Sequence, residues 1–263
     1  MKRTLSLLLT LSLLFPGVGQ EKAGDPLSSF SDQSFRTFRS TSVGGRLQTE
    51  ERGGEHFFSI TEEPVKGDLE LLEDGCFVYT PREGKQGRDS FGYQIIDEQG
   101  SISCDYLVTV QIDQQETDLI YEDMRGHPAG YAAVLLGEKG LFVGEKVAGR
   151  YCFSPEKPVT RGEFLSICMS LSGKPILSAV ASTGCMDDDA IPAWMKSYVS
   201  TAALQGVEVL QDGCFSADEA ITVRTAAELS GKTLGLSWPE ELCSDENLDR
   251  ATMAVILAKY LES

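Results

Sequence analysis

The spacing of apolar residues changes once along this chain, and the change divides it into two kinds of structure. From about residue 40 to 112, apolar and polar residues alternate in short runs separated by Gly, Pro and Asp. This period of two is that of a β-strand with one buried face. After the polar segment 113–117, apolar residues recur at spacings of three and four, as on a helix with one apolar face. The chain is therefore expected to be multidomain, with an all-β part followed by an all-α part.

The β part contains about six short runs with turn residues between them. Asp74-Gly75 precedes the run 76–80, and the segment 97–100 precedes the last run. Several short strands at this spacing predict a β-sandwich over residues 40–112. The residues expected to face inward on the two clearest strands are Phe77, Tyr79, Val108 and Val110.

The helical part contains two helix starts with good capping residues. Thr160 and Glu163 have the spacing of a capping box, in which the hydroxyl accepts from the N3 amide and the carboxylate accepts from the N-cap amide. Apolar residues follow at helical spacing: Phe164, Ile167, Cys168 and Leu171. Asp249 is a second N-cap, before another apolar stripe. We expect helices at both places.

The helical part also repeats itself. A shift of 66 residues places Asp123 on Asp189, Pro128 on Trp194, Gly140 on Gly206 and Leu141 on Val207. With a four-residue deletion, Phe153-Ser154 then falls on Phe215-Ser216 and Val159-Thr160 falls on Ile221-Thr222. Leu248-Asp249-Arg250 restarts the final helix a third time. A helix, a Gly-bounded turn, a loop and a capped second helix therefore occur twice, with an abbreviated third copy.

Four short motifs mark this repeat. They are Tyr121-Glu122-Asp123-Met124, Gly140-Leu141-Phe142-Val143-Gly144, Phe153-Ser154-Pro155 and Val159-Thr160-Arg161-Gly162-Glu163-Phe164. They resemble F-x-D-V, G-I-I-x-G, F-x-P and V-T-R-A-E-F of the S-layer homology module of Gram-positive cell-surface proteins. The resemblance implies three repeats, here 118–174, 175–236 and 237–263, in a pseudo-threefold helical bundle. It also implies grooves that bind an anionic, often pyruvylated, secondary cell-wall polysaccharide.

Three motifs of the β part match a second pattern. They are Pro64-Val65-Lys66-Gly67, the run from Asp74 to Pro81, and Gly87-Arg88-Asp89-Ser90-Phe91-Gly92-Tyr93. They are similar to P-x-x-G, D-G-x-F-x-Y-T-P and G-x-D-S-F-x-Y of the bacterial cadherin-like or immunoglobulin-like repeats of large surface proteins. The resemblance implies a spacer or adhesive module, whose own ligand stays unknown.

The best candidate for contact with the wall polymer is Arg161, and Arg250 is the second. An Arg in the first turn of a helix lies beside backbone N–H groups that the helix leaves free, and both suit an anion. The full set of candidate polymer-binding residues is Arg161, Arg250, Asp123, Thr160, Trp194 and Arg224. Two alternatives stay open: Arg161 pairs with an acidic neighbour instead, and Trp194 packs in the core instead of stacking on a sugar.

Three departures from the family pattern weaken this site. Pro128 replaces an aromatic residue in repeat one, and Val223 takes the arginine position in repeat two. Arg224 follows one residue later, about 100° around the helix. In repeat three the opening helix is shortened to little more than 238–242. At most two grooves therefore look equipped.

Charge and the N-terminal sequence point to export. The chain has 40 Asp and Glu against 23 Lys and Arg, so nucleic acid is not expected as a partner. Residues 1–19 read as a secretory signal, with two basic residues, an apolar run and small residues before the cleavage point. No membrane span is expected after cleavage. Segment 20–39 is expected to be an N-terminal extension whose phenylalanines pack on the sandwich as a strand or tether.

Other chemistry has little support in the sequence. The seven cysteines include no C-x-x-C pair, so we expect free thiols and no metal site or cofactor. The clustered acids, with Asp89, Asp97 and the run 187–189 as examples, lack the calcium-loop pattern and suit turns and helix caps. Only two histidines are present, and no catalytic motif occurs, so an enzyme is not expected.

These observations predict a secreted, non-catalytic surface protein held at the wall of a Gram-positive bacterium. The β-sandwich is the spacer or adhesive module, and the helical bundle binds the wall polysaccharide without a covalent bond. The alternative is a protein–protein assembly module whose degenerate bundle no longer binds polysaccharide.

Overall fold

The structure is a computed structural model, and it describes residues 33–48, 56–102 and 105–263. The chain divides into two compact units: unit 1 is Met1–Phe153 with Ala254–Ala258, and unit 2 is Ser154–Met253 with Lys259–Ser263. The division falls inside repeat one, after the linker at which the sequence placed the domain boundary. The expected signal peptide and Cys104 lie outside the described residues. No helix in the described part has both the length and the apolar character to cross a membrane.

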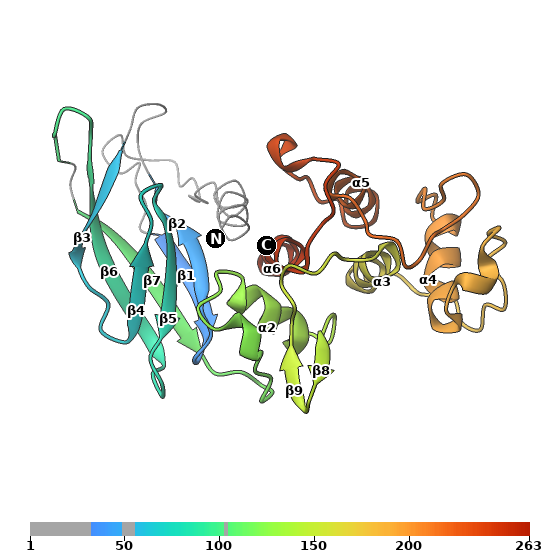
Figure 1. The fold of residues 1–263 in the computed structure, drawn as a ribbon, viewed down its shortest axis with the longest axis horizontal. Coiled ribbons are helices and arrows are strands. Elements are labelled where there is room, and N and C mark those ends of the chain that lie inside the picture. The colour runs from blue at the N-terminus through green and yellow to red at the C-terminus, as the bar shows by residue number, and fades with distance from the viewer. Residues whose placement is uncertain (1–32, 49–55, 103–104) are drawn as a thin grey trace. The chain divides into compact units, whose positions relative to one another are not determined.

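Unit 1 contains a sandwich of two β-sheets (Figure 1). The four-stranded sheet has the order β1 (Gln33–Phe38), β7 (Tyr106–Asp113), β6 (Gly87–Ile96) and β3 (Phe57–Glu62). The three-stranded sheet has the order β2 (Val43–Arg46), β5 (Cys76–Pro81) and β4 (Gly67–Leu71). Neighbouring strands are antiparallel, except that β1 pairs with β7 in parallel. The sandwich expected from the period of two is confirmed.

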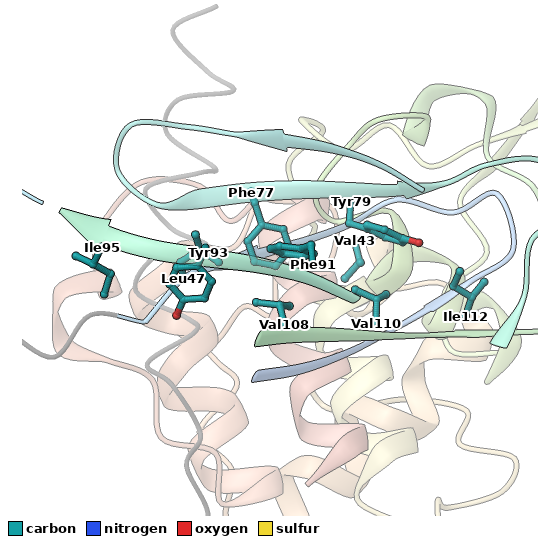
Figure 2. Packing of buried hydrophobic residues seen from close by; sticks show 10 residues of the cluster. All are labelled: Val43, Leu47, Phe77, Tyr79, Phe91, Tyr93, Ile95, Val108, Val110 and Ile112. Atoms are coloured by element: carbon teal, nitrogen blue, oxygen red, sulfur yellow. The ribbon is translucent and has the colours of Figure 1, made fainter. Parts of the chain in front are cut away.

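The core of the sandwich lies between the two sheets, as Figure 2 shows. The four residues predicted to face inward all belong to this core and are buried. Phe77 is central, because its ring makes edge contacts with Phe35 and Phe91 at centroid distances of 5.1 and 5.3 Å. Offset and edge-on aromatic pairs add to the free energy gained by burying the rings.

Strand β1 was one of the two alternatives given for segment 20–39, and strand β2 was not foreseen from the sequence. β1 lies in the segment expected to be an extension, so the sandwich begins by residue 33 rather than 40. β2 carries Gly44 and Gly45, and Val43 is its one residue that favours strands. Gly45 is required there, because a Cβ atom would lie 2.6 Å from ring atoms of Phe35 and Phe77.

A buried carboxylate ties the turn between β3 and β4 to the core of the sandwich. Asp89, 6% exposed, accepts hydrogen bonds from the backbone N–H groups of Val65 and Lys66 at 3.1 and 2.8 Å. It also accepts from the hydroxyl of Tyr79 at 2.7 Å, and burial followed by this bond raises the pKa of Tyr79. Asp89 therefore serves the fold through these donors, as the turn-forming role for the acids predicted.

The remainder of unit 1 follows the sandwich in the chain. It contains the short 3-10 helix η1 (Glu122–Met124), helix α2 (Gly130–Glu138) and the hairpin of β8 (Glu145–Val147) and β9 (Arg150–Cys152). The segment expected to be a linker is held to α2, since the N–H groups of Glu116 and Thr117 donate to the carboxylate of Glu138 at 2.7 and 3.1 Å.

Unit 2 is helical. Its elements are α3 (Arg161–Leu171), η2 (Asp188–Ala190), α4 (Ala193–Leu204), α5 (Val223–Leu234) and η3 (Glu240–Leu242), and α6 (Arg250–Glu262) contributes residues to both units. The capping box of Thr160 and Glu163 is confirmed, with both of its hydrogen bonds present. The N-cap role of Asp249 is confirmed as well, because its carboxylate accepts from the N–H of Thr252 at 2.7 Å.

Candidate functional site

Three equivalent residues of the repeats form a closed ring of backbone hydrogen bonds in unit 2. They are Val159, Ile221 and Leu248, each two residues before the start of a helix and each almost completely buried. Val159 N–H donates to the carbonyl of Leu248 at 2.8 Å, Leu248 donates to Ile221 at 2.8 Å, and Ile221 donates to Val159 at 2.9 Å. The starts of α3, α5 and α6 therefore surround one centre.

The first two N–H groups of α3, of α5 and of α6 all donate hydrogen bonds to backbone carbonyls of a neighbouring repeat. In α3, the N–H groups of Arg161 and Gly162 donate to the carbonyls of Glu219 and Ala217. In α5, those of Val223 and Arg224 donate to the carbonyls of Glu246 and Ser244. In α6, those of Arg250 and Ala251 donate to the carbonyls of Lys157 and Pro155. The cap residues of the three helices take the third N–H groups. The premise that these helix starts offer free donors to an anion is therefore wrong.

Arg161 is enclosed by repeat two. Arg161 is only 7% exposed, and its Nε and Nη2 donate to the carbonyls of Phe215 and Val209 at 2.9 and 2.7 Å. Burial lowers the pKa of the guanidinium, while the charges of Glu219 and Asp187 oppose that change. Arg161 therefore holds repeat one to repeat two, through carbonyl oxygens rather than through the acidic neighbour considered as the alternative.

The two other arginine candidates also reach the next repeat in the ring. Arg250, 2% exposed, lies 3.4 Å from Oε1 of Glu163, the residue that completes the capping box of repeat one. Arg224 pairs with Asp245 of repeat three at 2.8 Å and keeps 51% of its side chain exposed. Of the three guanidinium groups, only that of Arg224 lies open to a ligand in solution.

In repeat one and in repeat two, an aspartate accepts hydrogen bonds from the loop before the second helix of the repeat. Asp123 accepts from the N–H of Phe153 at 2.9 Å. In repeat two the residue in this role is Asp187, which accepts from the N–H groups of Phe215 and Ser216 at 2.9 and 2.8 Å. The shift of 66 residues places η2 on η1, as the alignment of Asp123 with Asp189 predicted, but the acceptor for the loop is the middle residue of η1 in repeat one and the residue before η2 in repeat two. Burial raises the pKa of Asp187, but these N–H donors together lower it further, so the net change is downward.

Trp194 is a candidate whose side chain is exposed to solvent. It lies in the first turn of α4 and is 59% exposed, so it does not pack in the core. Its ring contacts that of Tyr198 edge-on, at a centroid distance of 6.2 Å. Two further apolar residues of repeat two, Met186 and Leu204, are 76% and 77% exposed. The sequence did not single them out: Leu204 lies in α4, where helical spacing alone does not say which side is covered, and Met186 lies in the loop before η2.

A half-buried ion pair holds the loop before α4. Lys196 lies 2.7 Å from Asp188 Oδ2, and Thr183 donates its N–H and its hydroxyl to Oδ1 at 2.7 and 2.6 Å. These bonds, that from Lys196 first, lower the pKa of Asp188.

The ionised form of Asp188 is therefore favoured in the folded state. Its contribution to stability is present above the pKa of an unfolded aspartate, about 3.9, and is lost as the pH falls through the lower folded pKa. We expect Asp188→Asn to lower the urea midpoint of unit 2 at pH 7 and to lower it less at pH 3. Tryptophan fluorescence measures this, since both tryptophans lie in unit 2. Asp189→Asn, at an exposed position, is the control; equal losses at both pH values for Asp188→Asn would count against this role.

The cysteines and acids show no further site in the described part of the chain. Six cysteines there are free. Burial raises the pKa of Cys76 and of Cys168 to about 12, which leaves both thiols unreactive in the folded protein. Within the described ranges, no group of three His, Cys, Asp or Glu side chains is placed to hold a metal ion.

The comparisons with known proteins bear on the β part. No curated protein matches the chain. Among solved structures, endo-fucoidan hydrolase MfFcnA4 from glycoside hydrolase family 107 is 14% identical over 33% of this chain and 13% of that chain, with a TM-score of 0.28. The PKD domain from KIAA 1837 protein is 14% identical over 39% and 99%, with a TM-score of 0.25. The 2,6-sialyltransferase of Photobacterium sp. JT-ISH-224 is 15% identical over 32% and 18%, with a TM-score of 0.24.

The chain spans 13% of the length of the fucoidan hydrolase, and these TM-scores are too low to carry an argument about fold or activity. The match to a protein family is more informative. Residues 25–112 match the bacterial Ig domain family, over the segment that forms the two-sheet sandwich. This part of the chain is therefore a bacterial Ig-like domain, and a helical region follows it.

Proposed function

We propose that this protein is a secreted, non-catalytic module of a Gram-positive cell surface. The bacterial Ig-like domain acts as a spacer or adhesive module, and the helical repeats are an S-layer homology bundle that attaches it to secondary cell-wall polysaccharide. The observation that carries this proposal is the ring of Val159, Ile221 and Leu248. Three repeats that surround one centre, with the same donors used at each helix start, are what the motif resemblance implies.

The polymer contact is assigned to repeat two, at Trp194. Arg161 and Arg250 are enclosed, so they maintain the bundle and do not touch a polymer from solution. An exposed indole offers an apolar face to the C–H groups of a sugar ring and needs no charge to do so. Arg224 is the remaining exposed guanidinium among the candidates and is available to an acidic substituent if it leaves Asp245.

The alternative function, protein–protein assembly, is favoured by the charge of the helical part. Residues 118–263 contain 21 Asp and Glu against 12 Lys and Arg, which repels a polyanion. The dependence of wall binding on salt separates two modes of contact with the polymer. Stacking against a repelling surface strengthens when salt screens the repulsion, whereas binding through arginine–anion pairs weakens.

The test is co-sedimentation with purified Gram-positive cell walls. We expect Trp194→Ala to weaken binding about fivefold to tenfold, the effect of losing one stacking contact. Leu204→Ala removes a still more exposed apolar side chain from the same helix and is the control, expected to bind as the wild type does. If both variants bind as the wild type does, the assignment of Trp194 is wrong.

A further inference from the structure

Within unit 1, repeat one and the Ig-like sandwich meet along a line of direct contacts that we call the Ser42 seam. It comprises Phe38, Ser42 and Gly44 on the sandwich and Gly126, Pro128, Gly130 and Tyr131 on repeat one. The N–H of Tyr131 donates to the carbonyl of Ser42 at 2.8 Å, and the N–H of Gly44 donates to the carbonyl of Pro128 at 2.8 Å. The N–H of Gly126 donates to the hydroxyl of Ser42 at 2.9 Å. Backbone groups of both parts therefore satisfy each other.

The close contacts of the Ser42 seam leave no room for a side chain at Gly130. A Cβ atom at Gly130, the first residue of α2, would lie 2.7 Å from the carbonyl oxygen of Ser42 and 3.3 Å from its nitrogen. The rings of Tyr131 and Phe38 pack at a centroid distance of 5.2 Å. The start of α2 is therefore fitted to the sandwich at the level of single atoms.

The seam also protects a sheet edge. β2 is the edge strand of the three-stranded sheet, and Gly44 lies within it. An uncovered edge strand presents free N–H and C=O groups that pair with other chains. Here the carbonyl of Pro128 takes the edge N–H of Gly44, so repeat one completes the sandwich.

The equivalent position of repeat two carries different residues. The shift of 66 residues places Trp194 at the position of Pro128 and Lys196 at that of Gly130. Trp194 is exposed, whereas Pro128 is half-buried against β2. The proline that departs from the family pattern in repeat one therefore lies where its carbonyl accepts a hydrogen bond from the edge strand β2.

We propose that the part of repeat one that lies in unit 1, residues 118–153, is the docking partner of the Ig-like sandwich rather than a ligand-binding segment, and that the two unfold as one cooperative unit. A destabilising change in residues 118–153 then opens the sandwich as well, whereas one in the unit 2 part of repeat one does not. This inference goes beyond the proposed function, because it requires no polysaccharide and is tested without one.

Cys76 reports opening of the sandwich. It is fully buried in β5, and its raised pKa, about 12, keeps it unreactive until the sandwich opens. Thiol labelling at low urea, read peptide by peptide by mass spectrometry, gives its rate. We expect Gly130→Ala to speed labelling of Cys76 about tenfold or more, because the new methyl group collides with Ser42. In a helix without such a collision, replacing glycine by alanine stabilises the helix. Faster labelling of Cys76 in Gly130→Ala therefore identifies the collision at the Ser42 seam as its cause.

Gly162→Ala is the matched control. It adds a methyl group at the start of α3, in unit 2, where Met195 takes up the space. It is expected to speed labelling of the buried Cys168 and to leave Cys76 unchanged. If Gly130→Ala does not fold, Tyr131→Ala, which removes the ring contact with Phe38 and the packing of Tyr131 against the sandwich core, is expected to speed labelling of Cys76 about threefold. An unchanged Cys76 rate in a folded seam variant would overturn the proposal.

Discussion

Replacing Arg161 by Leu is expected to lower the free energy of unfolding of unit 2 by about 3 kcal/mol. The change removes two hydrogen bonds from a charged group and leaves the carbonyls of Phe215 and Val209 buried without these donors. It also separates repeat one from repeat two at the point where Arg161 joins them. Urea denaturation followed by tryptophan fluorescence measures the loss, because Trp194 and Trp238 both lie in unit 2.

Arg224→Leu is the control for this prediction. Arg224 lies at the start of the equivalent helix of repeat two, but its ion pair with Asp245 is exposed, and exposed pairs contribute about 1 kcal/mol or less. A large loss for Arg161 and a small one for Arg224 identify the buried guanidinium as part of the bundle. If Arg161→Leu keeps full stability and loses only its binding to walls, Arg161 is a ligand-binding residue after all.

The second large effect is expected at Asp89. Asp89→Ala removes the acceptor for Tyr79 and for two backbone N–H groups, and the loss of several buried hydrogen bonds costs about 3 kcal/mol. The sandwich then opens more often, and labelling of Cys76 becomes faster by about two orders of magnitude, since 1.4 kcal/mol corresponds to a factor of ten.

Asp68→Ala is the control at the same end of the sandwich. Asp68 pairs with Arg82 at 2.7 Å, but the two side chains are 69% and 50% exposed, so the loss is expected to be about 0.5 kcal/mol. Equal effects of the two substitutions on the Cys76 rate would contradict the role given to Asp89.

The sequence predicted the strands that have a regular alternation and the helices that have capping residues. β5 and β7 carry large apolar residues at every second position, and α3 and α6 begin after Thr160 and Asp249. β2 was missed because its two glycines have no β propensity; only the rings of Phe35 and Phe77, which come from other strands, explain why Gly45 is there.

The candidate site was predictable in its positions but not in its exposure. The motif resemblance marked Arg161, Arg250 and Trp194, and it led us to expect the arginines to be open to a ligand. Which side chains are enclosed depends on how the repeats meet. The carbonyls of Val209 and Phe215 lie about 50 residues from Arg161 in sequence and carry no side-chain signal. Backbone acceptors of this kind cannot be read from residue types.

The central claim, that the helical repeats attach the Ig-like domain to wall polysaccharide, is tested most directly by sedimenting the purified chain with cell walls. The measurement compares intact walls with walls from which acid treatment has removed the secondary polymer. The account predicts that the chain sediments with intact walls and stays in solution with stripped ones. Equal sedimentation with both would contradict it, because the chain would then bind the wall through something other than this polysaccharide.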